Sequence, residues 1–397
     1  MHLKALSPTG KIVFALALAA ATGAIPQVQA QTFKVIHNFT GGSDGGGPLD
    51  GFTADSAGNL YATASSGGAF QNGVVFKINQ GGVESVLYSF AGGTDGAHPE
   101  GGLIRDKAGN LYGTTTAGGG IESSGTVFMV TAAGKEEVLY TFPAGKNGAV
   151  PEAGLAMDAE GNLYGTTTAG GANGNGTVFK LTKQGAKWTE TLPYSFGTGT
   201  DGAIPVAGVT FDKAGNLYGT TSAGGAYGYG TVFELVRSGS AWTERILHSF
   251  TNGDDGAIPY GGLIVDKSGN LYGSATEDGA GGGGTIFELT PASGGWTFTV
   301  LYSNPGWGIS GSFRDLTLDA SGNLYGTTHC DGANNAGTVY KLTRGTGSWT
   351  YTSLYIFTGG TDGLYVFSNP VLEQGHLYGT TNQGGTNGNG VVWEITL

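Results

Sequence analysis

One short segment returns seven times along the chain, and it constrains the fold more than any other feature. Gly-Asn-Leu-Tyr occurs six times, and a seventh copy carries histidine in place of asparagine. The tyrosines follow one another at intervals of 51 to 54 residues, at Tyr61, Tyr112, Tyr164, Tyr218, Tyr272, Tyr325 and Tyr378. Self-similarity at this period indicates an architecture in which each repeat builds one supersecondary unit.

Each repeat carries several β-prone runs. A second marker, of the Gly-Thr-Val-Phe type, follows each tyrosine. Around Tyr218 we expect strands at 209–211, 217–221, 231–235 and 245–250, because these runs are rich in Thr, Val, Phe and Tyr. Clusters of Gly, Asn, Asp and Pro separate them, as turns require. Four strands in a repeat of this length predict one blade of a β-propeller.

The two ends of the repeat array complement each other. The last repeat stops after its third strand, and the missing fourth-strand segment stands at residues 33–39. A strand near the N-terminus can therefore complete the last blade, which closes the ring and removes exposed sheet edges. The sequence thus predicts an all-β fold in which residues 31–397 form a single domain, a seven-bladed β-propeller of four-stranded blades.

Residues 1–30 are predicted to be a secretory signal peptide. Lys4 and Lys11 precede an apolar run at 12–24, and a Val-Gln-Ala sequence ends at Ala30. We expect cleavage after Ala30 and a periplasmic or extracellular location. No apolar run reaches about 20 residues, so membrane insertion is not expected.

Composition narrows the classes of partner and fold. Glycine accounts for 78 of 397 residues, but aromatic residues make up 11 % and charged residues only 12 %, which favours an ordered, turn-rich chain over a disordered one. The net charge of −12 argues against nucleic-acid binding. Cys330 is the single cysteine, so no internal disulfide forms. We expect a monomer.

The repeat resembles a known bacterial family. The pattern Asp-x-x-Gly-Asn-Leu-Tyr-Gly-Thr-Thr, followed by Gly-Thr-Val-Phe, is clear at 212–221 and 230–233. It is similar to the GloVer tandem repeat, and the resemblance covers about 360 residues. The resemblance implies a secreted repeat protein, often with a C-terminal sorting anchor; after Leu397 we expect none. It implies no particular activity.

Repeated aspartates are interpreted as turn residues rather than as metal ligands. Aspartate can accept hydrogen bonds from a turn backbone, and the following glycine can take a positive φ. A calcium ion needs six to eight oxygens, whereas each loop offers one carboxylate. We expect no metal and no cofactor, with calcium at the Asp-Gly loops as the alternative. The hairpin aspartates are Asp55, Asp106, Asp158, Asp212, Asp266 and Asp319, and the Asp-Gly loops hold Asp44, Asp95, Asp201, Asp255 and Asp362.

The repeats differ at the position before each first strand. In a propeller this position rings the central axis, on the face that carries the loops between second and third strands; we call it the loop face. Paired carboxylates there could serve in glycoside hydrolysis, hydrogen-bond sugar hydroxyls, or be solvated without a role. His98 lies two residues before the second member of the ring. The ring comprises Asp50 beside Leu49, Glu100, Glu152, Val206, Tyr260, Arg314 beside Phe313, and Asn369.

A second group of departures lies in the loops of blades 5 to 7. An exposed tryptophan beside histidine and acids is a composition typical of sugar binding. Drift within a repeat array is the alternative. We expect neither a Cys330 nucleophile nor a metal site at 329–331. The candidates in this group are Glu277, Asp278, Trp307, His329 and Asp331.

These features favour binding of an extracellular polysaccharide or cell-envelope glycan on the loop face. One alternative is a glycan-active hydrolase or lyase that uses Asp50, Glu100 and Glu152, or Glu277 with His329 and Asp331. A second alternative is a protein-interaction scaffold. A propeller fold hosts all three functions, so the sequence leaves the question of catalysis open.

Overall fold

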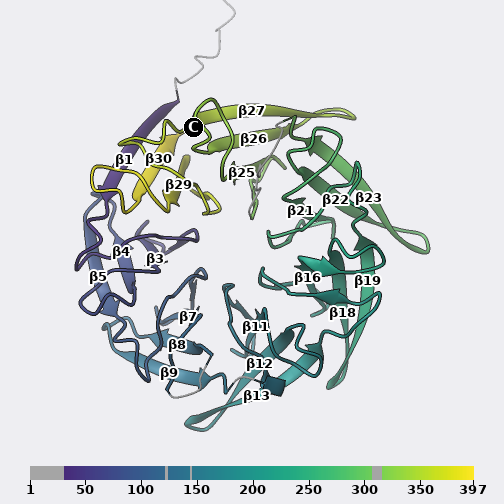
Figure 1. The fold of residues 1–397 in the computed structure, drawn as a ribbon, viewed down its shortest axis with the longest axis horizontal. Helices are drawn as coiled ribbons and strands as arrows, with labels where there is room; N and C mark the ends of the chain where they lie inside the picture. Colours follow the sequence, from purple (N-terminus) through teal and green to yellow (C-terminus); the bar gives the residue numbers. More distant parts are fainter. Residues whose placement is uncertain (1–30, 121–123, 144, 306–314) are drawn as a thin grey trace, which may run out of the picture. The chain divides into compact units, whose positions relative to one another are not determined.

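The computed structural model describes residues 31–120, 124–143, 145–305 and 315–397. Within these ranges the chain is all-β, apart from the short 3₁₀ turn η1 (Gly145–Asn147). Seven four-stranded antiparallel sheets stand in a ring around a central axis (Figure 1). The prediction of a seven-bladed β-propeller is confirmed.

Every blade runs from a short first strand beside the axis to a longer fourth strand at the rim. The strands of blades 1 to 3 are β2 (Thr53–Ala54), β3 (Leu60–Ala64), β4 (Val74–Ile78), β5 (Glu84–Ser89); β6 (Ile104–Arg105), β7 (Leu111–Thr115), β8 (Thr126–Val130), β9 (Glu136–Thr141); and β10 (Ala156–Met157), β11 (Leu163–Thr167), β12 (Thr177–Gln184), β13 (Lys187–Ser195). Those of blades 4 to 6 are β15 (Thr210–Phe211), β16 (Leu217–Thr221), β18 (Thr231–Ser238), β19 (Ala241–Ser249); β20 (Ile264–Val265), β21 (Leu271–Ala275), β22 (Thr285–Ala292), β23 (Gly295–Ser303); and β24 (Thr317–Leu318), β25 (Leu324–Thr328), β26 (Thr338–Arg344), β27 (Trp349–Ile356).

Blade 7 joins the two ends of the propeller. It consists of β28 (Val371–Glu373), β29 (His376–Thr381), β30 (Val391–Thr396) and, as its fourth strand, β1 (Thr32–Asn38). β1 pairs antiparallel with β30, from Thr32 opposite Thr396 to Asn38 opposite Val391. Figure 1 shows the purple start of the propeller beside its yellow end. The expected closure of the ring by the N-terminal strand is therefore observed.

The outer hairpins of blades 3 to 6 are longer than the sequence analysis predicted. In blade 4, β18 and β19 pair as far as Ser238 and Ala241, across a two-residue turn. Gly239 in this turn has a φ of 64°, which a tight hairpin turn of this kind requires. Trp242 thus lies in β19 opposite Arg237 rather than in a turn.

Loops of two kinds share one face, as expected. In most repeats the loop after a fourth strand pairs with the loop between the next second and third strands. In blade 4 this pairing forms a small sheet of β14 (Gly202–Ala203) and β17 (Ala223–Gly224). Equivalent bridges join Gly46 to Ser66, Ala97 to Ala117, Ala149 to Ala169, Ala257 to Glu277, and Leu364 to Gln383.

The core of the propeller is divided into seven apolar clusters, one between each pair of neighbouring blades. In the cluster between blades 3 and 4, Phe196 packs edge-on against Phe233, with centroids 5.2 Å apart. Both side chains are fully buried. Gly219 pairs with Phe233 across the strands, and a Cβ on Gly219 would lie 2.6 Å from the ring. The glycine after the repeated tyrosine therefore makes room for the aromatic ring.

Among the residues that the structure describes, no helix is long and apolar enough to cross a membrane.

Candidate functional site

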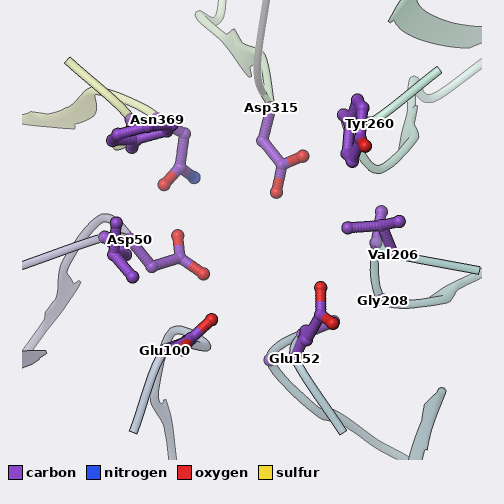
Figure 2. A pocket seen from close by; sticks show the side chains of 13 residues that line it. Asp50, Glu100, Glu152, Val206, Gly208, Tyr260, Asp315 and Asn369 are labelled. Carbon is purple, nitrogen blue, oxygen red and sulfur yellow. The ribbon is translucent and has the colours of Figure 1, made fainter. Parts of the chain in front are cut away.

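A pocket of about 160 Å³ lies on the axis at the loop face. Figure 2 shows side chains from several blades directed toward its centre. Six of the seven ring positions predicted from the sequence line it, so the structure brings them together. The pocket is lined by Leu49, Asp50, Glu100, Glu152, Ala153, Gly154, Val206, Ala207, Gly208, Tyr260, Asp315, Phe367 and Asn369.

The inner segments of the blades leave room for long side chains near the axis. Two residues before the first strand, five blades carry glycine, whereas blades 6 and 7 carry Asp315 and Asn369. A Cβ on Gly51 would lie 2.0 Å from the Asn369 Oδ1 atom. Glycine at Gly51 therefore allows the amide of blade 7 to reach toward the centre, as Figure 2 shows.

Two of the pocket carboxylates are held by backbone amides of neighbouring blades. Asp50 accepts hydrogen bonds from the amides of Gly51 and Gly102, each at 2.6 Å, and Gly102 belongs to the next blade. Asp315 accepts one from the amide of Gly262 in the preceding blade. Hydrogen bonds to an ionised carboxylate are stronger than neutral ones. These contacts fix both side chains and tie adjacent blades together at the axis.

Glu100 and Glu152 occupy equivalent places in blades 2 and 3. Thr116 Oγ1 lies 3.4 Å from Glu100 Oε1, and Thr168 Oγ1 lies 3.2 Å from Glu152 Oε1. The Thr116 hydroxyl also faces the carbonyl of His98, at 3.1 Å. Each glutamate is thus positioned by the second-to-third-strand loop of its own blade.

Blades 4, 5 and 7 also contribute apolar side chains to the pocket. Val206 and Tyr260 replace the two glutamates at the equivalent positions, and 38 % of Tyr260 is exposed. The third member, Phe367, is backed by the ring of His329, with centroids 3.9 Å apart. Val206, Tyr260 and Phe367 therefore add aliphatic and aromatic surface to a pocket that also carries four carboxylates.

The remaining predicted site residues lie outside the pocket. His98 is exposed on its loop, where its Nδ1 atom lies 3.0 Å from the carbonyl oxygen of Ser65 in blade 1. Glu277 and Asp278 lie in the blade 5 loop, and the backbone amide of Glu277 donates to Ala257. Asp331 is contacted by the hydroxyl of Thr328 and by the amide of Asn304.

Two predicted site residues, Trp307 and Arg314, lie outside the described residues.

The sequence analysis missed two kinds of functional candidate. Asp315 lines the pocket, and it could have been found by counting ten residues back from each repeated tyrosine, where five repeats have glycine. Tyr227 and Tyr229 are exposed by 60 % and 38 % in the blade 4 loop. Their signal is the Gly-Ala-Tyr-Gly-Tyr-Gly sequence, which places aromatic residues where other repeats have small ones.

The turn aspartates have the structural role that was expected. Asp55 accepts hydrogen bonds from the amides of Ala57 and Asn59, and from the side chains of Asn59 and Tyr61. Although burial would raise it, these bonds lower the pKa of Asp55 to about 2. Within the described ranges, no three His, Cys, Asp or Glu side chains are grouped so that they could hold a metal ion.

Comparison with known proteins relates the chain to one family. Residues 16–210 and 158–393 match the Gloeobacter/Verrucomicrobia repeat. No curated protein matches.

Two solved structures share the fold. A putative 6-phosphogluconolactonase from Bacteroides uniformis is 16 % identical, with a TM-score of 0.55 over 84 % of this chain and 90 % of that one. The extracellular domain of a putative hybrid two-component system from B. thetaiotaomicron is 12 % identical, with a TM-score of 0.59 over 91 % of this chain and 39 % of the other. At such identities the likeness shows the fold alone.

Proposed function

Because the chain belongs to the Gloeobacter/Verrucomicrobia repeat family, whose repeat builds its seven blades, we propose that it is a secreted propeller that binds an extracellular polysaccharide or cell-envelope glycan. The binding site is the axial pocket of the loop face. One observation carries this proposal: Glu100, Glu152 and Asp50 converge with Tyr260 on a single pocket.

The composition of the pocket suits a polyhydroxylated ligand. Carboxylate oxygens accept hydrogen bonds from sugar hydroxyls, and the Asn369 amide can both donate and accept. The partly exposed Tyr260 offers an aromatic surface on which the apolar face of a sugar ring can pack. Polar groups placed around a pocket that also offers apolar surface can fix the orientation of such a ring.

Further exposed apolar side chains lie on the loop face, in the loops of blade 4. Tyr227, Tyr229 and Ile204 are exposed on the loops of blade 4. The carbonyl of Tyr229 accepts a hydrogen bond from the amide of Ile258 at 2.9 Å, two residues before Tyr260. These exposed apolar side chains support binding of a glycan chain rather than of a single sugar.

Hydrolysis of a glycan is the second candidate function. Four carboxyl groups, contributed by four different blades, line the same pocket: Asp50, Glu100, Glu152 and Asp315. A pair of carboxyl groups can act as acid and base, or as acid and nucleophile, in glycoside hydrolysis.

A polysaccharide screen that records both retention and product release tests these candidates. We expect retention without products, and we expect Glu100→Gln with Glu152→Gln to weaken the affinity about ten-fold or more, because hydrogen bonds to charged groups contribute about 1.5–3 kcal/mol each. The matched control is Glu160→Gln, which changes an exposed glutamate in a hairpin of the opposite face. It should leave retention unchanged.

Each other outcome points elsewhere. Soluble products that disappear in the double variant support the hydrolase. Retention that is equal in the wild type and the double variant removes the axial pocket as the binding site. A chain that neither retains nor cleaves any polysaccharide overturns both candidates and leaves the protein-interaction scaffold.

A further inference from the structure

The hairpin between the first and second strands of blade 7 lacks the aspartate that accepts hydrogen bonds in the other six blades. In those blades the aspartate of the hairpin accepts a hydrogen bond from the tyrosine hydroxyl, for example from Tyr61 to Asp55 at 2.9 Å. In blade 7, β28 and β29 are joined by Gln374 and Gly375, with Glu373 opposite His376.

The turn of blade 7 therefore offers no aspartate to the hydroxyl of the repeated tyrosine. Among the described residues, the hydroxyl of Tyr378 has no hydrogen-bond partner. Burial, followed by the charges of Glu394 and Glu373, raises the pKa of Tyr378. Its hydroxyl accordingly stays protonated at neutral pH and is able to donate a hydrogen bond.

The neighbouring blade also lacks the tryptophan that packs on the repeated tyrosine of blades 3 to 5. Trp242, Trp296 and Trp349 lie edge-on against the repeated tyrosine of the preceding blade, with centroids 5.9 to 6.2 Å apart. These tryptophans stand on the long outer hairpins of blades 4 to 6. Blade 1 joins β4 to β5 by a short turn instead, so nothing equivalent lies over Tyr378.

A groove of about 540 Å³ lies between blades 7 and 1, on the face opposite the axial pocket. Its floor includes the apolar side chains of Leu60 and Ile78. His376 Nδ1 lies 2.7 Å from Glu394 Oε1, which orients both groups. We name it the seam groove, and its polar and aromatic lining is Lys34, Asn79, Gln80, Glu373, Gln374, His376, Tyr378 and Glu394.

We propose that the seam groove is a second saccharide-binding site, independent of the axial pocket. An aromatic ring beside an apolar floor matches the apolar face of a pyranose. The Tyr378 hydroxyl, the His376–Glu394 pair and the two glutamine amides supply donors and acceptors for its hydroxyl groups. The proposal uses none of the residues of the axial pocket.

Binding of defined tetrasaccharides to the intact protein tests this inference. The probes are tetrasaccharides of β-linked glucose and of N-acetylglucosamine. Their binding is measured by calorimetry and saturation-transfer NMR. The Glu100→Gln, Glu152→Gln background weakens the axial contribution, so that binding at the seam groove can be measured beside it. In this background we expect at least one of the two tetrasaccharides to bind. Adding Tyr378→Phe should weaken this binding about five-fold and leave the melting temperature unchanged.

The matched control is Tyr325→Phe, at the same position of blade 6. Its hydroxyl donates to Asp319 at 3.3 Å, so the substitution should lower the melting temperature and leave saccharide binding unchanged. His376→Ala is a second groove variant and should weaken binding as Tyr378→Phe does.

Two results overturn the inference: binding of neither tetrasaccharide in the Glu100→Gln, Glu152→Gln background, or binding there that Tyr378→Phe and His376→Ala leave unchanged. Failure of the axial proposal looks different. In that case the axial variants bind as the wild type does, and only the groove variants lose affinity.

Discussion

Aspartate occupies three kinds of position in this chain, and its partners distinguish them. Asp212 in a hairpin accepts hydrogen bonds from the turn and from Tyr218. Asp255 in a loop accepts from Thr251 and contacts His248 at 2.9 Å. Asp50 accepts hydrogen bonds from the amides of Gly51 and Gly102 and faces the pocket. Recurrence in most repeats therefore marks the structural aspartates, whereas departure from the repeat marks the candidate site.

A single methyl group tests the packing behind the repeated glycine. Gly219→Ala should destabilise the propeller by about 1–3 kcal/mol, because overpacking of a tight core costs that much. The added Cβ would lie 2.6 Å from Phe233 Cζ, and the ring is fully buried. Chemical denaturation measures the effect.

Gly93→Ala is the matched control for this substitution. A Cβ on Gly93 meets nothing within 4 Å, and its φ is not positive. It should leave the denaturation midpoint within error of the wild type. Equal midpoints for both variants would refute the packing argument.

At the scale of elements, one position on the fourth strand separates the blades into two groups. In blades 1 to 4 it holds Glu84, Glu136, Glu190 and Glu244. In blades 5 to 7 it holds aromatic rings that stack on the preceding blade: Phe298 on His248, Tyr351 on Tyr302 and Phe33 on Tyr355. The outer seams are thus carboxylic in one half of the ring and aromatic in the other.

The carboxylic seams should make stability fall as pH rises through the range 4.5 to 7. Burial and a neighbouring aspartate, Asp95 or Asp201, raise the pKa of Glu136 and Glu244 to about 7, from the ordinary 4.5. Between these values the unfolded chain has released the protons that the folded chain retains, so unfolding becomes easier. The loss of stability is complete above about pH 7. Its size is reduced because the two glutamates are about half exposed to solvent.

Thermal unfolding at pH 5 and pH 8 measures this effect. We expect Glu136→Gln with Glu244→Gln to reduce the fall in Tm between the two pH values by about 2 °C or more. Burial lowers the pKa of His37 and His248, so these residues make the protein less stable as pH falls below 6.5. This effect opposes that of the glutamates and is the same in the wild type and in the variant. Glu160→Gln is the control and should keep the wild-type slope. An unchanged slope in the double variant would contradict the assignment.

At the scale of the whole molecule, stability depends on closure of the ring. Each apolar cluster lies between two blades, so every blade needs both neighbours. Removal of residues 31–39 should expose the edge of β30 and the cluster around Phe39, which is fully buried. We expect a lower Tm and association through the open edge, measured by calorimetry and light scattering.

A permuted chain supplies the control for this deletion. Residues 31–39 are moved behind Leu397 through a two-residue turn, so that β1 follows β30 as a hairpin. This chain should regain the wild-type Tm and remain monodisperse. A deletion variant as stable as the wild type would show that closure contributes little.

Much of the fold could be predicted because its signals are local. The repeat period, the turn residues and the β-prone runs identified the blades, and the resemblance to the repeat family is confirmed. The lengths of the outer hairpins escaped prediction, since polar residues such as Arg237 do not reveal that they pair with Trp242. Secretion and cleavage after Ala30 stay predictions.

The sequence by itself determined the number of blades, the order of their strands and the strand that closes the ring, because these follow from spacing along the chain. Only the tertiary structure decided which departures from the repeat meet. Residues about 50 positions apart become neighbours at the axis once the ring closes, which brings Asp315 and Phe367 into the same pocket as Glu100. The same geometry leaves Asp331 in a loop contact with Thr328. Proximity across blades depends on ring closure and strand register, and the sequence of a single repeat specifies neither of them.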